Sequence, residues 1–126
     1  MKALKIPVAI LVLLLLAALT DGFLLTKQCA AWTQTLDAAE SAAVQEDWAL
    51  VQDTFNDLSH SWLNWQTYLH ILIDHAEIDH AEELLALCRL HTEEKDTAAL
   101  RVTVSQLRSL FSLLAETEQL NIKNVL

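Results

Sequence analysis

Residues 48–72, WALVQDTFNDLSHSWLNWQTYLHIL, carry an uninterrupted heptad pattern. Apolar residues follow one another at steps of three and four, which places them on one face of an α-helix. The stretch therefore predicts one long helix with one buried seam. The members of this seam are Trp48, Val51, Phe55, Leu58, Trp62, Trp65, Leu69 and Leu72.

Three further stretches repeat this rhythm. Glycine and proline occur once each in 126 residues, so almost nothing in the sequence favours strands or tight turns. We predict an all-α protein in which an N-terminal membrane anchor helix continues into an up-down-up-down antiparallel four-helix bundle, each helix burying one seam. The other three seams are Leu25, Cys29, Trp32, Leu36, Ala39 and Ala43; Ile78, Ala81, Leu85 and Cys88; and Leu100, Val104, Leu107, Phe111 and Leu114.

Aspartates mark the expected helix starts. Asp47 precedes the helix predicted for residues 48–72, and Asp96 is a suitable N-cap for the last helix. Asp74 followed by Glu77 matches a capping box, in which the aspartate accepts an early backbone N–H and the glutamate reaches back to it. We therefore expect the turn between the second and third helices at Asp74.

An apolar run at residues 6–19, preceded by Lys2 and Lys5, indicates a membrane-directed chain. This length matches a signal-peptide core, whereas residues 6–25 give about 30 Å of helix, enough to cross the hydrocarbon of a bilayer. Thr20-Asp21-Gly22 departs from the small residues that signal-peptide cleavage needs. We therefore expect an uncleaved anchor.

The basic residues also predict the topology. Because the first two lysines precede the apolar run, the positive-inside rule places the N-terminus in the cytoplasm and the following domain outside. The predicted organisation is a cytoplasmic tip and signal-anchor helix at residues 1–25, an extracytoplasmic bundle at residues 26–119 and an apolar C-terminal tail at residues 120–126. Membrane lipid is the expected partner of the anchor.

Acidic residues dominate the part of the chain that follows the anchor. All 17 Asp and Glu lie from Asp21 onward, against six Lys and Arg, which leaves this part with a net charge of −11. Such a charge repels phosphate backbones, so the sequence predicts no nucleic-acid partner. Solubility alone accounts for most of this charge.

Signs of catalysis are lacking in the sequence. It contains no glycine-rich phosphate loop, no nucleophile elbow and no Cys, His and acid at a catalytic spacing. We predict no enzymatic activity and no cofactor. Cys29 and Cys88 are expected to remain separate buried thiols, because the helix order separates them by about 15 Å in height whereas a disulfide allows about 7 Å between Cα atoms.

Five histidines among carboxylates raise the question of a metal. Glu77 and His80 have the Glu-x-x-His spacing of di-iron bundles. The one matching pair, Asp57 and His60, lies about 14 Å away in height, so such a site does not assemble. His60 falls off the seam and is expected to face solvent. We predict no metal ligand.

A candidate interaction surface lies at the membrane-facing end of the bundle. The helix of residues 48–72 becomes apolar on more than one face toward its end, and the C-terminal tail returns to the same end. Such a patch suits the lipid interface or a neighbouring membrane protein, although these residues equally suit a role in closing the core. The surface comprises Leu63, Tyr68, Ile71, Ile73, Leu120, Ile122, Val125 and Leu126.

Several motifs resemble a known family. They are Asp47-Trp48, residues 62–68, the following Asp74-His75-Ala76-Glu77-Ile78-Asp79, and the ending at residues 120–126. Together with the short anchored N-terminus they resemble the bacterial domain of unknown function 4363, over nearly the whole chain. The resemblance implies a small helical protein anchored in a bacterial cell membrane, and it assigns no activity or ligand to any residue.

Three functional interpretations follow. The leading one is a non-catalytic anchored module that binds a membrane or envelope protein. The second is a binder of a small ligand or lipid, which requires a cavity among the seams. The third is a weak metal-binding or pH-responsive module built on His70, His75 and His80. The oligomeric state stays open.

Overall fold

The computed structural model describes residues 2–125, with side chains described for residues 3–20 and 22–118. It contains four helices and, within the described residues, no strand. The all-α prediction is therefore confirmed. The helices are α1 (Lys2–Val44), α2 (Trp48–Leu72), α3 (His75–Glu93) and α4 (Thr97–Val125).

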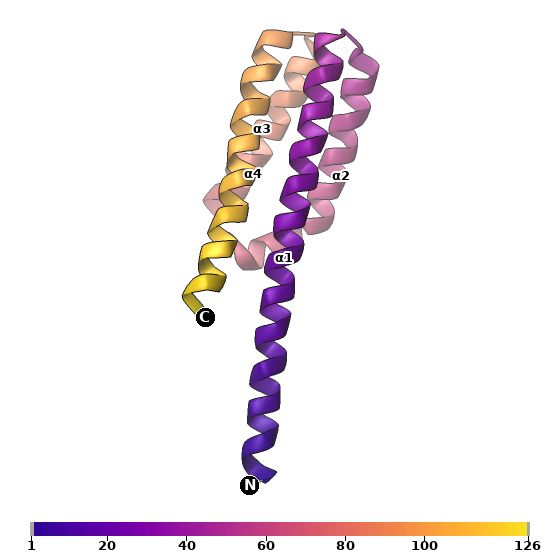
Figure 1. Cartoon of the computed structure of the whole chain (residues 1–126). Helices are drawn as coiled ribbons and strands as arrows, with labels where there is room; N and C mark the ends of the chain where they lie inside the picture. Colours follow the sequence, from indigo (N-terminus) through magenta and orange to yellow (C-terminus); the bar gives the residue numbers. More distant parts are fainter. Residues whose placement is uncertain (1, 126) are drawn as a thin grey trace.

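Successive helices run in opposite directions and form an antiparallel bundle (Figure 1). α1 packs against α2 and α4, and α3 also packs against α2 and α4. The first half of α1 extends beyond the other three helices (Figure 1). The predicted four-helix bundle, continuous with a long N-terminal helix, is thus confirmed.

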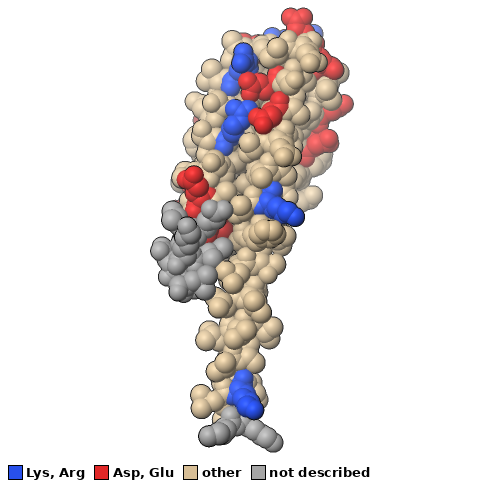
Figure 2. Space-filling model, viewed as in Figure 1, with Lys and Arg blue, Asp and Glu red and all other residues tan. Residues whose placement is uncertain are grey.

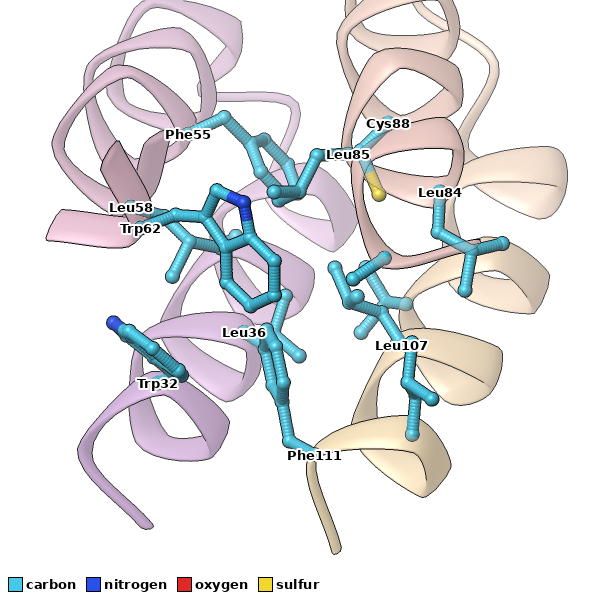
Figure 3. Close-up of a cluster of buried hydrophobic side chains, with 14 of the residues drawn as sticks. Trp32, Leu36, Phe55, Leu58, Trp62, Leu84, Leu85, Cys88, Leu107 and Phe111 are labelled. Carbon is cyan, nitrogen blue, oxygen red and sulfur yellow. The ribbon is translucent and has the colours of Figure 1, made fainter. Parts of the chain in front are cut away.

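The four predicted seams form most of the core, to which Ala42, Leu84 and Leu110 add buried side chains from outside the seams. Every seam residue is buried except Trp48, Trp65 and Leu72, which are half-buried and pack against the core. Trp32 lies among the aromatic rings of the core, with its ring centroid 5.4 Å from Trp62 and 5.2 Å from Phe111 (Figure 3). Heptad spacing therefore determines which face each helix buries.

Two connections with the same geometry form the end of the bundle away from the projecting half of α1, which we name the distal end. These connections are residues 45–47 and residues 94–96. Glu46 and Lys95 adopt positive φ angles of 61° and 54°. The next residue of each, Asp47 or Asp96, donates its N–H to a carbonyl five residues earlier, as in a Schellman motif. The same hydrogen bond thus satisfies a carbonyl at the end of α1 and at the end of α3, at positions 49 residues apart.

The same two aspartates also cap the helices that follow. Asp47 Oδ1 accepts from Leu50 N at 3.3 Å, and Asp96 Oδ1 accepts from Ala99 N at 3.1 Å. Each aspartate thus ends one helix with its backbone and begins the next with its side chain. The predicted helix starts at Asp47 and Asp96 are confirmed.

The α2–α3 connection differs from these two turns. α3 begins directly after Asp74, as predicted, but the Asp74 side chain makes no capping hydrogen bond. The N–H that a capping box would use, Glu77 N, instead donates to the Asp74 carbonyl oxygen at 3.1 Å. The capping-box prediction is therefore wrong for the side chains, because the backbone already satisfies this donor.

Both cysteines are free and buried. Cys29 lies on α1 and Cys88 on α3, and burial raises the pKa of each thiol to about 12. The prediction of two separate buried thiols is confirmed. Both behave as small apolar core residues, and neither is a reactive nucleophile at neutral pH.

Candidate functional site

The projecting part of α1, which we name the stalk, comprises residues 3–20. Its side chains are exposed except for the half-buried Leu15 and Leu19. Figure 2 shows uncharged side chains along most of it, with a basic group only near its tip. By length and composition, α1 is apolar enough to cross a membrane.

The opposite end of the bundle from the distal end, which we name the base, lies beside the middle of α1. It consists of the α2–α3 connection at residues 73–74 and the helical turns beside it. Ser61 Oγ accepts from Gln28 Nε2 at 3.3 Å and from Trp32 Nε1 at 2.8 Å, so residue 61 of α2 is level with about residue 30 of α1. Ten residues further on, Ile71 is level with about residue 20.

α4 reaches at least as far toward the N-terminal tip of α1 as α2 does. Phe111 contacts Trp32 with 5.2 Å between ring centroids, so the end of α4, 14 residues further on, is level with about residue 18 of α1. Figure 1 shows the C-terminus beside the projecting half of α1. The base therefore lies alongside the apolar segment of residues 6–25, rather than beyond its end.

This overlap constrains where a membrane fits. The helix that projects beyond the end of α4 is about 24 Å long, whereas the hydrocarbon of a bilayer is about 30 Å thick. A span that uses all of residues 6–25 therefore includes the height of the base.

The predicted interaction surface divides into three groups. Leu63 and Ile71 are 57% and 78% exposed. Tyr68 is half-buried, with its ring edge-on to Trp65 at 5.3 Å, and Ile73 packs against the core. The side chains of Leu120, Ile122, Val125 and Leu126 lie outside the described residues, although the α4 backbone is helical to Val125.

Sequence analysis missed part of the surface on α1. Phe23 and Leu24 are 62% and 46% exposed, immediately before the first fully buried seam residue, Leu25. The Lys27 ammonium lies 5.6 Å from the centroid of the Phe23 ring. Lys27 and Phe23 thus make a cation–π contact on the surface of α1. The signal was the pair of apolar residues directly before the first seam position, Leu25.

A pair of histidines crosses the α2–α3 connection. His70 Nδ1 lies 3.2 Å from His75 Nδ1, and the ring centroids are 5.0 Å apart. His60 and His80 are exposed, as expected for His60. Among the residues with described side chains, no group of three or more His, Cys, Asp or Glu is arranged to hold a metal ion.

Surface grooves account for the larger hollows described in the molecule. One of about 510 Å³ lies between α2 and α3 near the distal end, beside Trp48 and Lys95. Another of about 620 Å³ follows α4 beside Glu40 and Arg101. Both are open to solvent, and the first reaches inward to Trp48 and Phe55 of the α2 seam.

The fold and the surface together define a helical-bundle protein with an N-terminal helix apolar enough to cross a membrane. A family model described as a domain of unknown function, DUF4363, matches residues 23–125, and the chain belongs to this family. The match begins two residues before Leu25, so it covers the bundle and not the stalk. Neither a curated protein nor a solved structure matches the chain.

Proposed function

We propose that the protein is a non-catalytic module of a bacterial cell membrane, with its N-terminus in the cytoplasm and its bundle on the outer side, where the base contacts a membrane protein. One observation carries this proposal. The base is level with about residues 18–20 of α1, within the segment of residues 6–25 that is apolar enough to cross the bilayer. A partner at that depth is itself in the membrane.

The chemistry of the base supports an apolar partner. Ile71 exposes 78% of its surface and Phe23 62%, both at heights where lipid or a transmembrane helix lies. No Lys or Arg occurs between Lys27 and Arg89, so α2 and most of α3 offer no cation for anionic lipid headgroups. Apolar packing, and not attraction to phosphate, would hold the base in place.

The causes of the pKa shifts in the titratable groups support a non-catalytic role. Those with clearly shifted pKa values are the buried thiols of Cys29 and Cys88 and the salt-bridged pair Glu40 and Arg108. Burial or a surface ion pair accounts for each. Glu40 and Arg108 line one surface groove together, but they are bound to each other in a salt bridge, which accounts for both shifts without a catalytic role.

Site-directed spin labelling tests the depth of the base. Ile71→Cys and the control Leu50→Cys each place one label on the exposed face of α2, at the base and near the distal end. The native thiols are buried with raised pKa values and stay unlabelled in the folded protein. For the full chain in lipid nanodiscs, we expect oxygen to relax the label at 71 and a water-soluble nickel complex to relax the label at 50.

The same two positions test the partner. A photoactivatable cross-linker on Ile71→Cys in native membranes should link to one membrane protein, and the same reagent on Leu50→Cys should not. Equal access of the nickel complex to both labels would place the base in water and overturn the membrane-level base. Lipid depth at 71 together with equal cross-linking at 71 and 50 would instead leave the base in lipid without a protein partner.

A further inference from the structure

The two imidazoles that face each other across the α2–α3 connection have the spacing of ligands to one metal ion. His70 Nδ1 and His75 Nδ1 are 3.2 Å apart. Two nitrogens bound to a tetrahedral zinc ion at about 2.0–2.1 Å are separated by about 3.3 Å. Without an ion the two nitrogens are within hydrogen-bond distance, and which ring donates depends on the tautomer.

The backbone that carries both exposed rings is fixed on either side of the connection. His70 follows Leu69, and His75 precedes Ile78 by three residues; Leu69 is fully buried and Ile78 is 1% exposed. Ile73 N donates to Leu69 O at 2.8 Å, and Ile78 N donates to Asp74 O at 3.2 Å. The backbone on either side is thus fixed to the core, so binding requires little ordering of the turn.

The charge around the pair favours a cation. Asp74, Glu77 and Asp79 lie in the same connection and the first turn of α3. The stretch between Lys27 and Arg89 contains no Lys or Arg to oppose a positive ion. These carboxylates attract a cation to the turn at long range, and within the described residues they do not complete a third ligand.

We propose that His70 and His75 form a two-ligand site for a divalent transition-metal ion at the base of the bundle. Imidazole nitrogen selects zinc, copper, nickel or cobalt over magnesium and calcium, which prefer oxygen. Two protein ligands leave the remaining coordination positions to water or to an external donor. The site is therefore open, as metal sites that meet a further ligand are, and unlike closed structural zinc sites.

Cobalt and zinc serve as probes of this site. The full chain, without an affinity tag and in mild detergent, is titrated with each ion by isothermal calorimetry, and cobalt binding is also followed by visible absorption. We expect one ion per chain with an affinity in the micromolar range. His70→Gln and His75→Gln should each weaken binding by about tenfold or more, since loss of even an indirect partner of a metal ligand costs that much.

His60→Gln is the matched control, because His60 is also exposed on α2 but lies ten residues from His70. Its binding should equal that of the unaltered chain. Unchanged circular dichroism in all three variants excludes unfolding as the cause. Absence of saturable binding, or equal binding by His70→Gln and His60→Gln, overturns the site. Neither result bears on the depth of Ile71, so the proposed function is tested separately.

Discussion

The two ends of the bundle are built in different ways. At the distal end, both connections satisfy the backbone of two helices with hydrogen bonds from Asp47 and Asp96. At the base, the single connection relies on backbone bonds, its aspartate caps nothing with its side chain, and Ile71 is 78% exposed beside it. Aspartate side chains cap the helices at the first end, whereas at the second the exposed Ile71 lies beside an aspartate that caps nothing.

This difference indicates what each end faces. At the distal end, capping and charge contribute to stability. Arg108 adds to this on the α1–α4 face, where it binds Asp37 at 2.6 Å and Glu40 at 2.9 Å. The base carries apolar side chains that are not needed for the core, so their environment must come from outside the chain. The predictions below test whether side chains of the distal half stabilise the fold while the exposed side chains of the base do not.

The largest expected effect compares a core residue near the distal end with an exposed residue at the base. Phe55 is 2% exposed, so Phe55→Ala leaves a cavity and should lower the free energy of unfolding by about 3–5 kcal/mol. Ile71→Ser removes a side chain that few atoms contact, and should change it by less than about 0.5 kcal/mol. Urea unfolding of the full chain in mild detergent, followed by tryptophan fluorescence, measures both.

A loss above about 2 kcal/mol for Ile71→Ser would show that Ile71 is a core residue and that the base is part of the packed interior. The exposed face of the base would then need no partner. Leu50→Ser provides the control for an exposed apolar residue near the distal end, since Leu50 is 51% exposed on the same helix.

Sequence periodicity predicted the core because burial on a helix depends on spacing alone. Trp32, Phe55 and Phe111 follow from steps of three and four, and all three are buried. The Asp74 side chain could not be predicted in the same way. Whether it or its own carbonyl accepts from Glu77 N depends on local backbone geometry, which a capping-box motif does not specify.

The base could be predicted only in part. Helix lengths alone indicate that α2 returns to the height of the anchor, and Ile71 was recognised as an apolar residue off the seam. Ile73 is also an isoleucine off the seam, but it packs against the core because the turn directs it inward. The sequence grouped His70 and His75 with His80, but the structure shows only the first two in contact, because that contact depends on two rotamers across the turn.

The second expected effect compares the caps at the two ends. Asp96→Ala removes the acceptor for Ala99 N and should cost about 1 kcal/mol. Asp74→Ala removes no side-chain hydrogen bond, so its cost should stay below about 0.5 kcal/mol. Urea midpoints at constant slope measure the difference. Equal losses would mean that the Asp74 side chain caps α3 in solution, and the contrast between the ends would disappear.

The smallest expected effect concerns the ion pairs of the distal half. The hydrogen bond from Arg108, assisted by the one from Arg101, holds the pKa of Glu40 below its usual value despite partial burial. A carboxyl with a lowered folded-state pKa stabilises the fold above its unfolded-state pKa, near 4.5, and loses that stabilisation as the pH falls through the folded-state value.

Glu40→Gln should therefore cost less than about 1 kcal/mol at pH 7, because solvent screens the pair. The difference from the unaltered chain should shrink below about pH 4.5 and in high salt. Glu83→Gln replaces an exposed carboxylate on α3 and is the control for the substitution itself. A Glu40→Gln cost that is constant from pH 7 to pH 3 would assign the effect to packing rather than charge, and would remove the ion pairs from the contrast between the distal half and the base.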